Sequence, residues 1–329
     1  MAQQSYLYAS ARVSALERGL LNRDALKRMA EGNLEDAVRI LLDAHYGDMS
    51  DATANDCERM IEAERQKTMR VIGEISPEPA LTDLILFKTD AHNLKILLKV
   101  RVLGHGEIDF LAGGLYPQEM LGCCVQSANY RDLPAEMAAA LQELERKLSI
   151  DPQPQYISAA VDCGYLRHAR RVVSELGGSS AVEFVTALCD FSNMLTFLRM
   201  RAMGAAREDL KAMLLPEGDI RCRALIEAYD LSADSLARVL TGTKASVAIR
   251  KGLDGVLETG SIAMLEKERD NYLLSLVSGH RYENDTIYPV IGYYLARDRV
   301  AKAIRLILTA KRNRLDDAVI AERLRELYG

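Results

Sequence analysis

The sequence contains an internal repeat with an offset of 100 residues, and this repeat constrains the fold more than any other feature. Residues 81–104 (LTDLILFKTDAHNLKILLKVRVLG) align without a gap to residues 181–204 (AVEFVTALCDFSNMLTFLRMRAMG). Both segments place apolar residues at the three- and four-residue spacing of a helix. Both end in glycine, which favours the left-handed backbone that follows a helix C-terminus. We therefore predict two related long helices, over 81–103 and 181–203.

A third, weaker copy closes the chain. The periodicity predicts a helix over 288–308, in which Ile304 and Leu308 fall where Leu94 and Leu98 fall in the first copy. A repeat of about 100 residues is longer than the 20–50 residues of a solenoid unit, so we expect three related helical lobes with approximate threefold symmetry. The third lobe is expected to pack with the N-terminal helix. The predicted lobes span residues 1–150, 151–257 and 258–329.

Composition supports an all-α fold. Aromatic residues make up only 6% of the 329 residues and Trp is absent, whereas strand-rich domains favour aromatic and β-branched residues. The net charge of -5 argues against a nucleic-acid binder, which would carry a basic surface. We expect no membrane-spanning segment, because the uncharged apolar stretch 286–296 has about half of the roughly 20 residues that a bilayer requires. Residues 1–19 lack the pattern of a secretory signal.

The sequence lacks motifs that carry catalysis or hold a cofactor. The five histidines are scattered without HExxH spacing, and no GxxxxGK[ST] phosphate loop is present. The six cysteines include no CxxC pair, which is typical of buried thiols in a reducing cytoplasm. We therefore expect no catalytic residue, no cofactor, no metal site and no bound nucleotide.

Three polar positions recur in the first two copies of the repeat. They pair Asp90 with Asp190, Asn93 with Asn193, and Arg101 with Arg201. The Asp and Asn share a helix face with apolar residues, so we favour a structural role at helix–helix contacts over ligand binding.

One segment near the end of the sequence is strongly basic. Residues 297–314 contain seven basic side chains and a single acid, Asp298. One interpretation is a solvated basic surface balanced by acids further along the chain. The other is a binding site for an acidic protein partner, with Arg299, Lys302 and Arg305 at its centre.

Four segments, in order along the whole chain, carry a resemblance to a known family. They are YLYASARVSALE at 6–17, DAHNLKILLK at 90–99, IYPVIGYYLA at 287–296 with IRLIL at 304–308, and IAERLRELY at 320–328. The chain resembles the C subunit of the A/V-type rotary ATPases, called the d subunit in the eukaryotic vacuolar enzyme. It departs from the family pattern in the third copy, where Arg297 replaces a Lys and Ala303 replaces an Asn.

The resemblance implies a non-catalytic, all-helical protein shaped as a three-lobed, pseudo-threefold funnel. Family members lie peripherally on the cytoplasmic face of the membrane, on the proteolipid rotor ring, and receive the foot of the central shaft, which the D and F subunits form. Torque passes through them, which couples ATP synthesis or hydrolysis to proton or sodium transport.

Two rival classes stay open from the residues alone. An enzyme on a helical scaffold would need convergent polar groups, which the sequence does not reveal. A generic scaffold or interaction protein of the TPR or HEAT kind would show a period near 34 or 40–47 residues, whereas the observed offset is 100.

Overall fold

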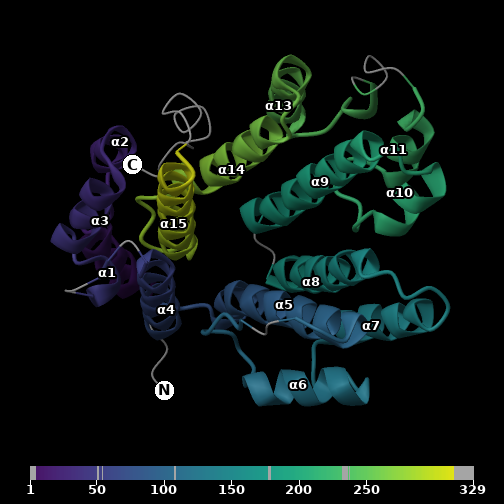
Figure 1. The fold of residues 1–329 in the computed structure, drawn as a ribbon, viewed down its shortest axis with the longest axis horizontal. Helices are drawn as coiled ribbons and strands as arrows, with labels where there is room; N and C mark the ends of the chain where they lie inside the picture. Colours follow the sequence, from purple (N-terminus) through teal and green to yellow (C-terminus); the bar gives the residue numbers. More distant parts are fainter. Residues whose placement is uncertain are drawn as a thin grey trace. The chain divides into compact units, whose positions relative to one another are not determined.

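The computed structural model describes residues 5–49, 52–53, 55–106, 109–176, 179–231, 236 and 238–314. Helices supply all regular structure in these ranges, which hold no β-strand, so the predicted all-α class is confirmed (Figure 1). The helices are α1 (Tyr6–Glu17), α2 (Arg23–Glu31), α3 (Leu34–Asp43), the 3-10 turn η1 (Tyr46–Asp48), α4 (Cys57–Ile75), α5 (Pro79–Leu103), α6 (Gln118–Ser127), α7 (Ala135–Leu148), α8 (Gln155–Leu176), α9 (Ser179–Ala202), α10 (Arg207–Met213), α11 (Cys222–Ala228), α13 (Ser246–Thr259), α14 (Ala263–Ser278) and α15 (Tyr288–Arg312).

Short polar side chains begin the second and third helices. The side chain of Asn22 accepts a hydrogen bond from the N–H of Ala25 at 2.9 Å, and that of Asn33 accepts from Asp36 at 2.8 Å. The Asp36 carboxylate in turn accepts from the Asn33 N–H, which completes a capping box. These side chains satisfy N–H groups that have no partner within the first turn, and so they determine where α2 and α3 start.

Three long helices end in the same way. Helices α5, α9 and α15 contain 25, 24 and 25 residues. Beyond each of them the backbone enters the left-handed region, at Gly104 (φ 72°), Gly204 (φ 66°) and Arg314 (φ 53°). Arg314 lies 210 residues after Gly104, which is also the separation of Ile304 from Leu94. The third copy therefore keeps the register that the sequence assigns to it, with arginine in the position of the glycines.

Internal contacts divide the chain into two compact units. The first unit contains residues 1–82 and 274–329, and the second contains residues 83–273. In the first unit, α15 packs against α1, α2, α3 and α4. The core formed there joins apolar side chains from residues 21–61 with Val300, Ile304 and Ile307 of α15. Helices from the N-terminal part of the chain and α15 therefore share one core, because the apolar stripe of α15 is covered by N-terminal helices.

Among the described residues of the second unit, two hydrophobic clusters are each centred on one of the long helices. One joins α5 with α6, α7 and α8, and the other joins α9 with α10, α11, α13 and Leu265 of α14. Ile157 and Val161 of α8 are fully buried in the first cluster, because α8 packs along α7 (Figure 1). The α5 cluster extends across the boundary predicted after residue 150, and the α9 cluster extends across the one predicted after residue 257. Residues 1–150 fall in both units. The division into three lobes stays a prediction.

Helix α9 also has the length and composition of a membrane span. Residues 181–202 reach a mean hydropathy of 1.3, and 56% of the most apolar window is buried inside the protein. Phe191, Met194 and Phe197 are 0% exposed and lie in the second cluster. A central helix of a helical core has these properties, and we assign α9 that role.

Candidate functional site

The repeated Asp–Asn pair of α5 holds the loop that follows this helix. Asn93 Oδ1 accepts a hydrogen bond from the Leu111 N–H at 2.9 Å, and its Nδ2 donates to the Leu111 carbonyl at 2.8 Å. Asp90 accepts from the N–H groups of Leu115 at 2.7 Å and Tyr116 at 3.5 Å. Asp90 and Asn93 are 0% and 2% exposed. We call this arrangement of Asp90, Asn93 and loop 111–116 the first clamp, because it satisfies backbone groups that have no partner in regular structure.

The equivalent pair of α9 does the same to its own loop. Asn193 Oδ1 accepts from the Leu215 N–H at 2.7 Å, and its Nδ2 donates to the Leu215 carbonyl at 3.3 Å. Asp190 accepts from the N–H groups of Asp219 at 3.1 Å and Ile220 at 2.9 Å. This is the second clamp. Its helix residues are offset by 100 from the first clamp and its loop residues by 104, so the connection is four residues longer.

A glycine lies against the carboxylate of each clamp. A Cβ added at Gly114 would overlap Oδ1 of Asp90, with Cγ of Asp90 2.7 Å away. A Cβ added at Gly218 would overlap Oδ1 of Asp190 and would lie 2.5 Å from the carbonyl oxygen of Thr186. Neither position has room for a side chain, because the loop backbone approaches the carboxylate directly.

These contacts refine the role that the sequence predicts for the repeated residues. Asp90, Asn93 and their copies fix a loop to a helix, whereas contacts between helices were expected. The physical reason is that an amide side chain matches the N–H and C=O of an extended peptide, and a carboxylate matches successive N–H groups. The sequence does not reveal these partners, because the loops carry no motif of their own.

The third repeated residue differs between the copies. Arg101 forms a two-pronged ion pair with Glu145 at 2.6 and 2.8 Å and donates to the Val125 carbonyl at 2.6 Å, and Tyr130 also donates to Glu145. Arg201 is exposed, and its guanidinium lies 5.5 Å from the ring centre of Phe197. Only Arg101 therefore joins helices of its own cluster through ion pairing.

Burial changes the protonation of the clamp carboxylates. It raises the pKa of Asp90 to about 6, against the lowering effect of the Leu115 and Tyr116 N–H groups. It likewise raises the pKa of Asp190 to about 6, where the Ile220 and Asp219 N–H groups oppose the shift. The charge of Asp219 raises the pKa of Asp190 further, and the charge of Arg170 lowers it.

We expect the second unit to lose stability as the pH rises. A carboxyl whose pKa is higher in the folded chain than in the unfolded chain binds its proton more tightly when folded, so stability falls between the two values, from about pH 4 to about pH 6. When the pH is lowered from 7.5 to 5, the unfolding free energy of wild type should rise by about 1–3 kcal/mol relative to that of Asp190→Asn. Urea unfolding of both proteins at the two pH values measures this difference. A difference that does not change with pH would contradict this account.

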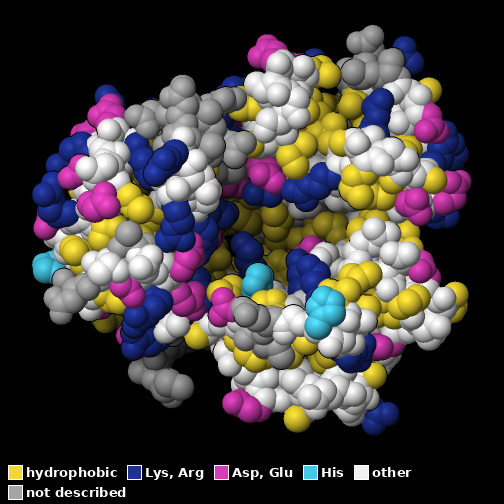
Figure 2. Space-filling view, viewed as in Figure 1, with side chains coloured by type: hydrophobic (Ala, Val, Ile, Leu, Met, Phe, Trp, Pro, Cys, Tyr) yellow, Lys and Arg dark blue, Asp and Glu magenta, His cyan; other side chains and the backbone are white. Residues whose placement is uncertain are grey.

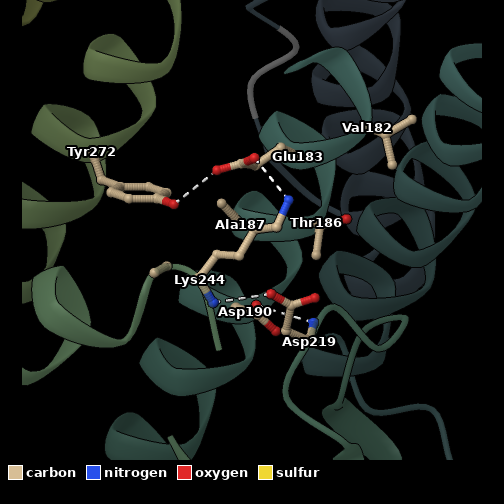
Figure 3. A pocket seen from close by; sticks show the side chains of 9 residues that line it. Val182, Glu183, Thr186, Ala187, Asp190, Asp219, Lys244 and Tyr272 are labelled. Atoms are coloured by element: carbon tan, nitrogen blue, oxygen red, sulfur yellow. Dashed lines mark hydrogen bonds and ion pairs between the residues drawn. The ribbon is translucent and has the colours of Figure 1, made fainter. Parts of the chain in front are cut away.

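A small polar pocket of about 150 Å³ opens beside the second clamp (Figure 3). Lys244 Nζ donates to Glu183 Oε2 at 2.9 Å, and the Tyr272 hydroxyl donates to Glu183 Oε1 at 3.2 Å. The Lys244 N–H donates to Asp219 at 3.1 Å. These polar groups bind one another and connect α14 and the turn before α13 to α9. The side chains that line the pocket therefore connect helices to one another, and the carboxylates of Glu183 and Asp219 are bound by neighbouring residues.

The basic segment near the C-terminus is only partly at the surface. Arg299 is 4% exposed, so this side chain does not present its charge to a partner in this conformation, contrary to the expectation for it. The reason is that Arg299 lies on the side of α15 that faces the core of the first unit. Lys302 pairs with Asp298 at 2.7 Å, and Arg305 pairs with Glu58 of α4 at 2.9–3.0 Å. Lys302 and Arg305 remain partly exposed.

The part of the chain that the structure describes offers no cluster of metal ligands. Within it, no group of three or more His, Cys, Asp and Glu side chains is placed to hold a metal ion. The six cysteines are free thiols. On the face drawn in Figure 2, basic and acidic side chains are interspersed. The fold and its polar contacts thus define a helical scaffold built from internal repeats, in which buried polar side chains hold loops in place.

Comparison with known proteins assigns this scaffold to a family. The sequence model of the ATP synthase (C/AC39) subunit family matches residues 9–323. The chain is 22% identical to the C subunit of the V-type sodium ATPase of Enterococcus hirae over 316 residues, which cover 95% of each chain. It is 24% identical to the C subunit of the A-type ATP synthase of Pyrococcus furiosus, over 98% of this chain and 90% of that one. The corresponding A-type protein of Methanocaldococcus jannaschii is also 24% identical, over 93% of this chain and 82% of its own length.

The chain belongs to the ATP synthase (C/AC39) subunit family. It is therefore a component of a membrane-associated ATPase complex of the V/A type, and it has partner subunits in that complex. Members of this family are non-catalytic, so the chain is not an enzyme by itself. The resemblance drawn from the four sequence segments is confirmed.

Proposed function

We propose that the chain is the central-stalk adaptor of its ATPase, joining the rotor shaft formed by the D and F subunits to the proteolipid ring. In this role it lies peripherally on the cytoplasmic face of the membrane and transmits torque. ATP synthesis or hydrolysis is thereby coupled to proton or sodium transport. The observation that carries the proposal is the family match over residues 9–323, nearly the whole chain.

The internal structure of the second unit supports a mechanical role. Both clamps bury a carboxylate and an amide to hold a loop that has no regular structure of its own. Such fully bonded polar groups give one defined arrangement, because any displacement leaves a buried group without its partner. An adaptor that transmits torque needs surfaces that keep their shape under load, and clamped loops on packed helices provide them.

We expect high salt to release the chain from membranes without detergent. The ring presents many identical loops to a single adaptor, so their contacts should be few and partly polar, and charge pairs at a surface are screened over roughly 8–10 Å at 0.1–0.15 M salt. The contact with the shaft should bury a more apolar core, which salt does not weaken. Membranes washed in high salt should therefore release the chain together with the shaft proteins, as seen by blotting the supernatant.

Lys302 and Arg305 are the candidates for the charged contact, since Arg299 is buried. A Lys302→Glu, Arg305→Glu variant should leave the membrane at lower salt than wild type. Lys27→Glu, at an exposed pair with Glu31, is the matched control and should leave the release curve unchanged. Release that requires detergent would contradict the peripheral location, and normal assembly of the double variant would contradict the charged contact alone.

A further inference from the structure

Helix α1 buries one side and exposes large apolar side chains on the other. Ala9, Ser10 and Val13 are buried in the first unit. Leu7 is 64% exposed and Tyr8 is 46% exposed. Exposed Ala11 and Ala15 continue the same side of the helix, at four-residue spacing from Leu7. A helix normally turns polar residues to water, so this surface calls for an explanation.

The loop between α14 and α15 is fastened beside this helix. The Ser10 hydroxyl donates to the side-chain oxygen of Asn284 at 2.9 Å, and Arg281 pairs with Glu17 at 2.9 Å. The loop is braced internally by His280 and Glu283, whose side chains lie 2.7 Å apart. Between these attachments stands Tyr282, which is 84% exposed. An aromatic side chain is thus held out to solvent by a loop that is attached at both ends.

The exposed charged side chains of α1 and of its C-cap residue are arginines, Arg12 and Arg18. The two carboxylates at the helix are engaged, Glu17 by Arg281 and Glu78 by the Tyr6 hydroxyl. Asp285 is the exposed acid of the loop. We use the name "α1 face" for the exposed side chains of α1, the arginine that caps it and the loop tyrosine: Leu7, Tyr8, Ala11, Arg12, Ser14, Ala15, Arg18 and Tyr282.

We propose that the α1 face is a docking surface for a protein partner that presents an apolar helix flanked by acidic residues. Tyrosine and arginine are the residues that most often carry binding energy at protein interfaces, and here both are held by a braced scaffold. The acidic flanks follow from charge complementarity with Arg12 and Arg18. The inference rests on the proposed function, which makes the shaft proteins the partner to be tested.

Two other occupants fit the surface less well. An anionic membrane is usually bound by clusters of four to eight Lys and Arg, and the α1 face has two arginines. A second copy of the chain would bring the same two arginines together across a twofold axis, because such an interface uses one patch on both copies. Like charges placed opposite each other disfavour that association.

The test measures binding of the purified chain to the purified shaft pair, the D and F subunits, by calorimetry. The Tyr8→Ser, Tyr282→Ser variant should bind at least tenfold more weakly, since exposed aromatic anchors are lost. Arg12→Glu should weaken binding most at low salt, because the charge contact is screened as salt rises. Val247→Ser and Leu257→Ser change side chains of α13 that are 80% and 70% exposed, and these control variants should bind as wild type does.

The outcomes separate the two proposals. If wild type does not bind the shaft pair, the proposed function fails and the docking inference fails with it. If wild type binds and the tyrosine and arginine variants bind equally well, only the docking inference is overturned. It is also overturned if wild type floats with phosphatidylserine vesicles, or self-associates in sedimentation, and the tyrosine variant loses that behaviour while it still binds the shaft pair. Unchanged thermal melting of each variant establishes that a loss of binding is not a loss of folding.

Discussion

Replacing Gly218 by alanine is expected to destabilise the second unit by about 3–5 kcal/mol. The added methyl group would overlap the Asp190 carboxylate and lie 2.5 Å from the Thr186 carbonyl oxygen. Asp190 is 1% exposed and holds two loop N–H groups, so it cannot move without losing both hydrogen bonds. The Thr186 carbonyl belongs to helix α9 and cannot rotate away. Urea unfolding of the variant measures the loss.

Two other glycines make this prediction specific. At Gly114 the three nearest atoms all belong to the Asp90 side chain and none to the backbone, so Gly114→Ala should cost less than Gly218→Ala. Gly122 lies inside α6 with no atom within 4 Å of an added Cβ, and Gly122→Ala should be neutral or stabilising by up to about 1 kcal/mol. Similar unfolding free energies for Gly218→Ala and Gly122→Ala would show that the loop does not approach Asp190 as described.

A loss of about 3–5 kcal/mol is also expected when Arg297 is replaced by methionine. Glu64 of α4 is 5% exposed, and it pairs with Arg297 of α15 at 2.8 Å while accepting from the Gly47 N–H at 3.0 Å. Methionine fills a similar volume but leaves the carboxylate buried without its counter-charge. The cost is therefore that of an uncompensated buried charge, which thermal or urea unfolding of the chain would detect.

The matched control is Arg305→Met on the same helix. Arg305 pairs with Glu58, and the two side chains are 49% and 62% exposed. Water replaces the lost partner there, so the expected cost is about 1 kcal/mol or less. Adding Glu64→Gln to Arg297→Met should recover part of the stability, because the buried charge disappears. Equal costs for the two arginine variants would mean that burial of the Glu64 pair contributes nothing.

The helices themselves follow from local sequence. Apolar spacing over 81–104 and 181–204 predicts α5 and α9, and their ends coincide with the glycines that favour left-handed backbone. Asn22 and Asn33 cap α2 and α3, because each side chain accepts a hydrogen bond from the N–H group three residues further on. These features depend on neighbours within one or two turns, so they can be placed from the sequence without knowledge of the fold.

The repeat is also visible in the sequence, but its full correspondence is not. The loop residues of the two clamps are related by an offset of 104, and an alignment that keeps the helix offset of 100 pairs them wrongly. Gly114 and Gly218 become equivalent only when their approach to the carboxylates is known. The basic segment misleads for a similar reason, since spacing alone does not show that Arg299 faces the core.

Sequence alone determined the all-α class, the C-terminal ends of α5 and α9, the family and the residues that recur between copies, whereas α15 extends to Arg312, four residues beyond its predicted end. Tertiary structure decided what the polar side chains contact. Asp90 and Asp190 hold loops, Glu64 and Arg297 pair in the first unit, and Arg299 is buried. The physical reason is the range of the interactions. Helix propensity and capping act over a few residues, whereas a buried polar side chain finds its partner only after distant segments have packed around it.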